Sequence, residues 1–422
     1  MNGIKSSDYV INIISKVLLV LLGLLSSAFM TRYLSVELRG EYAFVNEIVT
    51  ISSLVLDMGL FQSYSYFFIK YKNHDVYSAF LNMYTIQFIF NIVLASLIYF
   101  VAGRTETLLF ICIQVPINVL IRQFNGTMAV ENVRLKILVE FLCGVLKVVL
   151  FGIIYFMKDK IGINLGWVIF CILLINILSL IIFLLNKGKT PNLKKIDIQF
   201  SKEVIAYSWL PMISMLLLTF NYSVDVLFMK SLGTAEELSY YSVAVTIVNY
   251  VWLFPDAFKE VLISRVSRSE NTNHIVHVLK YSIYSIVIVI VGFFILGKPF
   301  ITLLYGELFL PAYSMTLVLC VGAFSMCFFK IINVVFLAEG KRIFFFIIFL
   351  ISVVANMVLN YLTIPIYGMY GAGISSVVSY SVCGFSFLIK FLHDKKINIR
   401  HVFLFDSREI EELLKLLRKV HS

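Results

Sequence analysis

The chain is poor in charge. Charged residues make up 14% of its 422 residues and hydrophobic residues 60%, and the mean hydropathy is +0.91. Soluble domains carry about 25% charged residues, so this composition excludes that class. A chain that has lipid as its solvent must satisfy its backbone hydrogen bonds internally, which only helices or a closed barrel can do. The apolar runs are about 20 residues long and do not alternate, which predicts an all-α integral membrane protein.

Motifs for catalysis and metal binding are also lacking. The six cysteines all fall inside apolar runs, without a CxxC pair or a histidine cluster, so we expect no disulfide and no metal site. No glycine-rich loop ends in Lys-Ser/Thr, which excludes a built-in ATPase. The connections between apolar runs are too short to hold a catalytic domain or the large external loop of a membrane polymerase. We predict neither an enzyme nor a cofactor.

Twelve apolar segments can each cross the bilayer, and the first is too long for a signal-peptide core. They are residues 10–31, 41–69, 79–102, 107–130, 138–157, 163–186, 205–229, 240–264, 279–297, 311–338, 343–364 and 370–393.

A basic stretch, residues 187–204, separates two comparable halves. We predict an N-terminal six-helix bundle (1–186), this linker, a C-terminal six-helix bundle (205–394) and an amphipathic tail (395–422). Offsetting the halves by 199 residues aligns Tyr42 with Tyr241 and Asp57 with Asp256, as a parallel repeat would. Chance alignment of similar apolar helices is the alternative.

Lysine and arginine fall mainly on one side of the predicted spans, 23 residues against seven. The positive-inside rule therefore places both termini and the linker in the cytoplasm. This bias, together with attraction to anionic membrane lipids, accounts for the net charge of +10, so we expect no nucleic-acid partner.

Polar residues follow one face of the fourth span: Gln114, Asn118, Arg122 and Asn125 are spaced by four, four and three residues. We interpret this stripe as the lining of a substrate cavity. Interhelical hydrogen bonding, with Arg122 reaching the membrane interface, is the alternative.

Single cations lie in three other spans: Lys16, Lys147 and Lys330. Each is a candidate substrate contact, although Lys16 and Lys330 are close enough to the cytoplasmic end to snorkel and Glu140 can neutralise Lys147.

Four of the carboxylates inside predicted spans are candidates for ion coupling: Glu47, Asp57, Asp225 and Asp256. Such groups typically relay H+ or Na+, but they can equally be salt-bridge partners of the lysines. Asp57 precedes Gly59 and Asp256 follows Pro255, where a helix can bend.

Several motifs resemble polysaccharide flippases of the multidrug/oligosaccharidyl-lipid/polysaccharide exporter superfamily. They are Arg32-Tyr33-Leu34-Ser35, with Ser35 where glycine is commoner, Gly40-Glu41-Tyr42, Gly59-Leu60, and the segments 221–244, 303–322 and 368–380. The resemblance implies two six-helix bundles around a central cavity in a bacterial cytoplasmic membrane. It also implies movement of undecaprenyl-diphosphate-linked oligosaccharide, such as an O-antigen or capsule unit, to the outer leaflet.

The cations agree with that substrate, because a pyrophosphate needs fixed positive charge. Two other classes remain open: a cation-coupled multidrug antiporter and a scaffold protein. Association with other polysaccharide-assembly membrane proteins is a further expectation. The sugars and the coupling ion are not specified by the sequence.

Overall fold

A computed structural model describes residues 6–71, 75–187, 190–192, 196–266 and 272–404. For residues 6–16, 187, 260, 261, 263–266 and 272–274 only the backbone is described. The predicted amphipathic helix of the tail (residues 406–420) therefore lies outside the described residues.

The chain divides into two compact units, Met1–Ser242 with Ile301–Leu310, and Val243–Phe300 with Pro311–Ser422. Helices of the first unit are α1 (Ser6–Tyr33), α2 (Val36–Asp57), α3 (Leu60–Lys70), α4 (Val76–Val101), α5 (Glu106–Glu131), α6 (Val133–Phe156), α7 (Lys158–Ile161), α8 (Leu165–Lys187) and α9 (Ile198–Leu232). Helix α10 (Ala235–Val251) contributes to both units. The others are α11 (Leu253–Val266), α12 (Thr272–Leu304), η2 (Glu307–Phe309), α13 (Pro311–Ala338), α14 (Arg342–Tyr367), α15 (Met369–Lys395) and α16 (Arg400–Phe403).

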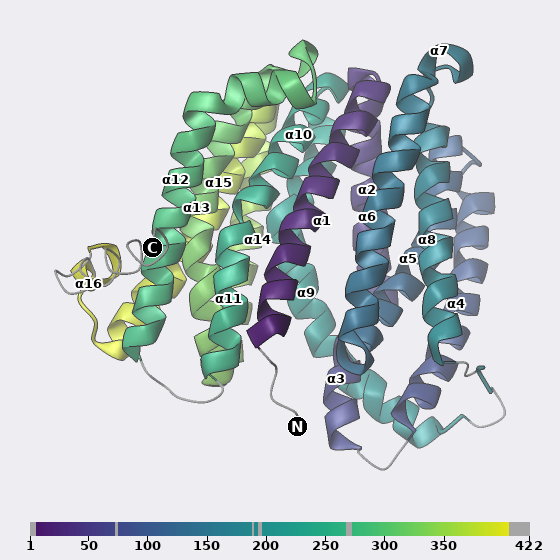
Figure 1. Ribbon diagram of the computed structural model, residues 1–422, viewed down its shortest axis with the longest axis horizontal. Helices are drawn as coiled ribbons and strands as arrows, with labels where there is room; N and C mark the ends of the chain where they lie inside the picture. The colour runs from purple at the N-terminus through teal and green to yellow at the C-terminus, as the bar shows by residue number, and fades with distance from the viewer. Residues whose placement is uncertain (1–5, 72–74, 188–189, 193–195, 267–271, 405–422) are drawn as a thin grey trace. The chain divides into compact units, whose positions relative to one another are not determined.

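The described residues contain helices and no strands, which confirms the all-α prediction (Figure 1). Ten described helical segments are long and apolar enough to cross a membrane. The two other predicted spans fall on α1, whose apolar described part is Val17–Tyr33, and on α10 and α11, which are separated at Trp252. Large apolar side chains on α4, α12 and α14 are exposed, as lipid-facing residues should be.

The second predicted span is broken into α2 and α3 at Met58 and Gly59, which have φ of 53° and 74°. Glycine adopts such left-handed backbone conformations readily, which explains why the helix bends where the sequence places Gly59. The break leaves Asp57 as the last residue of α2.

Packing inside the first unit brings α1 against α6, α2 against α5 and α9, and α4 and α8 against α5. Helix α3 packs on both α5 and α9. In the second unit α15 packs on α13 and α14, and α11 packs on α13. The division of the chain at residues 187–204 and the internal repeat stay predictions.

Candidate functional site

The polar stripe of α5 is present as a continuous face within the first unit. Gln114 is buried, whereas Asn118, Arg122 and Asn125 are half-buried. The Cζ atom of Arg122 lies 5.0 Å from the centroid of the Phe61 ring on α3. Arg122 makes no ion pair with a described carboxylate, and its buried Nε has no hydrogen-bond partner among the described residues. The guanidinium is therefore held mainly by an aromatic face.

Asp57 lies close to this arginine. Its carboxylate, 1% exposed, accepts a hydrogen bond from the backbone N–H of Phe61 at 3.4 Å and interacts electrostatically with Arg122 beyond ion-pair distance. From the sequence alone we expected Asp57 to act in ion coupling and Arg122 to act separately in substrate binding. The break between α2 and α3 brings them together, because it turns Phe61 and the end of α2 toward α5.

Two glutamines that the sequence reasoning missed continue the network. The Nε2 atom of Gln123 donates to Oε1 of Gln87 at 2.5 Å, and Nε2 of Gln87 donates to the backbone oxygen of Leu56 at 2.5 Å. Gln123 also lies beside the Asp57 carboxyl. Gln123 is one residue from Arg122 and so falls on another face of the helix, outside the stripe that the four-residue spacing revealed.

Glu47 on α2 and Asp225 on α9 form an acidic pair in the same unit. The hydroxyl of Ser223 donates to Oε1 of Glu47 at 2.5 Å, and the hydroxyl of Tyr241 donates to Oδ2 of Asp225 at 2.5 Å. Asp225 is fully buried and interacts electrostatically with Glu47. Each carboxylate accepts a hydrogen bond from its own neutral hydroxyl, and two carboxylates that interact in this way can bind a small cation. The sequence of neither α2 nor α9 alone indicates that Glu47 and Asp225 lie near each other.

Lys147 is exposed on α6 and has no ion pair or hydrogen bond with a described residue. Glu140, the alternative partner considered from the sequence, pairs instead with Lys136 at 3.2 Å. A lysine four residues along the helix is nearer than one seven residues away. Lys147 thus remains an uncompensated cation within a membrane helix.

Lys330 and Asp256 meet in the second unit. The Nζ atom of Lys330 lies 2.9 Å from both carboxylate oxygens of Asp256 and 4.8 Å from the centroid of the Trp252 ring. This pairing agrees with the salt-bridge alternative for these residues. The remaining candidate, Lys16, has its side chain outside the described residues.

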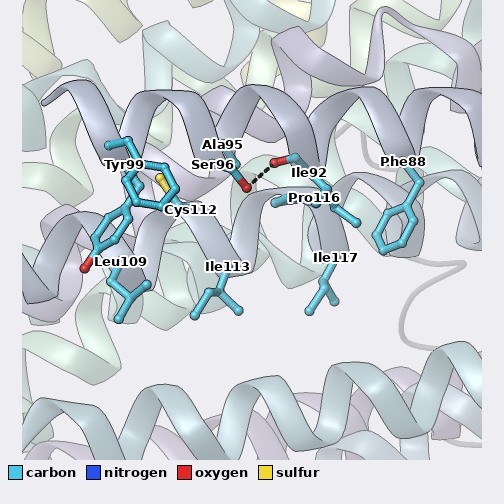
Figure 2. Close-up of a pocket in the computed structure, with 11 residues that line it drawn as sticks. Phe88, Ile92, Ala95, Ser96, Tyr99, Leu109, Cys112, Ile113, Pro116 and Ile117 are labelled. Atoms are coloured by element: carbon cyan, nitrogen blue, oxygen red, sulfur yellow. Dashed lines mark hydrogen bonds between the residues drawn. The ribbon is translucent and has the colours of Figure 1, made fainter. Parts of the chain in front are cut away.

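A separate apolar groove of about 310 Å³ lies between α4 and α5. Figure 2 shows Ile92 and Tyr99 of α4 facing Ile113 and Pro116 of α5, with the Ser96 hydroxyl bonded back to the Ile92 carbonyl at 2.8 Å. No lining side chain carries a charge. The groove fits hydrocarbon and not a charged headgroup.

The arrangement as a whole is an all-α membrane fold of two helical bundles with charged groups inside the membrane helices. No protein-family model and no curated protein matches the chain in sequence.

Solved structures with the same fold are found. Lipid II flippase MurJ in an inward closed conformation aligns with a TM-score of 0.76 and 17% identity, covering 92% of this chain and 88% of that one. An inward-facing multidrug resistance MATE family transporter of the MOP superfamily gives a TM-score of 0.66 and 14% identity, covering 89% and 95%. A MATE transporter of Vibrio cholerae gives 0.59 and 13%, covering 92% and 95%. The chain therefore has the fold of these flippases and transporters.

Proposed function

We propose that the protein is a flippase that moves undecaprenyl-diphosphate-linked oligosaccharide from the inner to the outer leaflet by alternating access. The fold shared with a lipid II flippase and the sequence motifs of polysaccharide flippases support this proposal. Its main proposed contacts are the cations and amides within the helices of the first unit.

The observation that carries the proposal is that Arg122 and Lys147 are intramembrane cations without an ion pair to any described carboxylate. A charge at mid-membrane costs at least about 2.5–3.5 kcal/mol on insertion scales, so it is retained where it has a function. A pyrophosphate offers oxygen acceptors that a guanidinium binds in bidentate fashion and a lysine binds as a point charge.

The amides extend the proposed site along α5. Gln114, Asn118 and Asn125 share the face of Arg122, where they would hydrogen-bond the headgroup beside its phosphates. Lys16 and Lys330 are kept as proposed contacts. Lys330 would reach a substrate only after releasing Asp256, which now holds it.

We further propose that H+ or Na+ drives the cycle through the intramembrane carboxylates. Glu47 and Asp225 support this best, because they approach each other with hydroxyl partners. Substrate charge would act on Asp57 through Arg122. Asp256 would alternate between its ion pair with Lys330 and the coupling ion.

The test measures the leaflet distribution of lipid-linked oligosaccharide in cells depleted of the protein and complemented with variants. Depletion should leave the intermediate on the cytoplasmic leaflet. Arg122→Ala and Lys147→Ala should each fail to restore export, and Arg122→Lys should fail if bidentate contact matters. Lys158→Ala, which removes a half-buried cation over the Tyr155 ring, serves as the control that should export normally. Wild-type export by both alanine variants would refute the cationic site.

A cation-coupled multidrug antiporter is the second candidate, favoured by the acidic pair of Glu47 and Asp225 and by the fold of MATE transporters. It predicts cation-dependent dye efflux without a glycan phenotype. A scaffold protein would show neither activity, and removal of the intramembrane charges would then change stability alone.

For topology we propose a bacterial inner-membrane location with both termini and residues 187–204 in the cytoplasm. Labelling of single cysteines introduced at Thr190 and Arg104 with a membrane-impermeant reagent would test it. Only the variant at Arg104 should react in intact cells.

A further inference from the structure

Arg32 fixes the segment 301–310 against the end of α1. Its Nε donates to the carbonyl of Leu304 at 2.9 Å, and its Nη2 donates to those of Thr302 at 3.1 Å and Leu303 at 2.8 Å. These carbonyls belong to the last turn of α12, whose final carbonyls have no amide partner within the helix; that of Thr302 also accepts from the backbone N–H of Gly306 at 3.1 Å. Tyr305, the residue that follows Leu304, therefore belongs to the first unit.

Arg39, near the start of α2, is a buried cation in that same region. Its side chain is 3% exposed, its Nε donates to the Thr31 hydroxyl at 3.1 Å, and its Cζ lies 5.5 Å from the centroid of the Tyr42 ring. No ion pair joins it to a carboxylate in the described part of the chain. Burial of an unpaired charge costs free energy. One neutral hydrogen bond and one contact with an aromatic ring recover less than that cost.

Two buried hydroxyls of the first unit, those of Tyr305 and Ser27, lack well-formed hydrogen bonds among the described residues. Tyr305 is 2% exposed and lies within electrostatic range of the guanidinium. Its hydroxyl neighbours that of Ser27, yet neither buried oxygen has a hydrogen-bond partner of acceptable geometry among the described residues. A buried cation thus lies within electrostatic range of Tyr305, and the hydroxyl of Tyr305 adjoins that of Ser27.

We propose that Arg39, Tyr305 and Ser27 bind one small inorganic anion. A guanidinium and two hydroxyls all donate, so together they match a ligand that only accepts. A water molecule would satisfy the hydroxyls and leave the charge of Arg39 uncompensated, whereas an anion satisfies both. The site is distinct from the Arg122 stripe and does not depend on the proposed flippase activity.

Equilibrium dialysis of the full chain in detergent with radiolabelled chloride, and separately with inorganic phosphate, tests the proposal. We expect saturable binding of about one anion per chain that Arg39→Gln abolishes. Tyr305→Phe and Ser27→Ala should weaken it by on the order of 10-fold each, since each removes one hydrogen bond to a charged group.

Arg104→Gln is the matched control. Arg104 also lies over an aromatic ring, at 4.8 Å from Phe100, but its side chain is exposed. It should leave anion binding unchanged. Saturable binding of either anion that Arg39→Gln removes supports the site. Absence of saturable binding of both anions, or equal binding by Arg39→Gln, overturns it. If Arg39→Gln does not fold, full affinity in both Tyr305→Phe and Ser27→Ala overturns it instead.

Discussion

Replacement of Gly59 by alanine tests the helix break that brings Asp57 and Phe61 to Arg122. Gly59 has φ of 74°, and a Cβ there would overlap the backbone oxygen of Ser208 on α9. Alanine in this left-handed conformation costs about 1–2 kcal/mol. Overpacking against backbone adds about 1–3 kcal/mol. The sum predicts a loss of roughly 2–5 kcal/mol in the free energy of unfolding.

Gly340, at the end of α13, provides a matched control because it has the same φ, 74°, and a Cβ added there would meet no atom within 4 Å. Gly340→Ala should therefore cost only the conformational part, about 1–2 kcal/mol. Reversible denaturation of the purified protein in mixed micelles measures both values, and export assays show whether displacing α3 also impairs transport. Equal destabilisation by the two substitutions would mean that α3 does not pack on α9 at Ser208, and the description of this site would fail.

Three other predictions concern the second unit. Gly384→Ala on α15 would place a Cβ onto the backbone oxygen of Ser325 on α13 and should destabilise by about 1–3 kcal/mol in the same unfolding assay. Gly292→Ala meets open space and should stabilise by up to about 1 kcal/mol. Burial raises the pKa of Glu339, but hydrogen bonds, the largest from Lys341, lower it overall below its ordinary 4.5. The ionised Glu339 therefore contributes fully to the free energy of unfolding above pH 4.5, its ordinary pKa. This contribution is lost as the pH falls through the lower pKa of the folded state. In the same unfolding assay, the free energy of unfolding of Glu339→Gln should not show this loss at acidic pH.

Hydropathy and spacing predicted much of this fold. They predicted the helical class, most of the spans and the bend near Gly59, because membrane helices satisfy their own backbone and need only length and apolarity. The stripe on α5 was predictable for a related reason: a spacing of three or four residues fixes the angle around one helix.

Partners across helices were not predictable in this way. Glu47 and Ser223 are 176 residues apart in sequence, and nothing on α2 alone indicates that α9 will present a hydroxyl to it. Arg39 was counted from the sequence only as one charge on the outer side, since burial of a residue near a turn depends on which distant segment covers it. Tyr305 comes from such a segment, and Arg32 anchors it.

The contrast between Lys330 and Arg122 gives the physical reason for assigning the site to the first unit. Lys330 has both oxygens of Asp256 at 2.9 Å and the Trp252 ring at 4.8 Å, so its charge is compensated within the fold. Within the described ranges, Arg122 has the Phe61 ring at 5.0 Å and the Asp57 carboxylate beyond ion-pair distance. Selection for stability alone would pair Arg122 as Lys330 is paired, or replace it with an apolar residue. The anionic substrate that we propose would supply the missing charge, and it would account for the retention of Arg122 in an unpaired state.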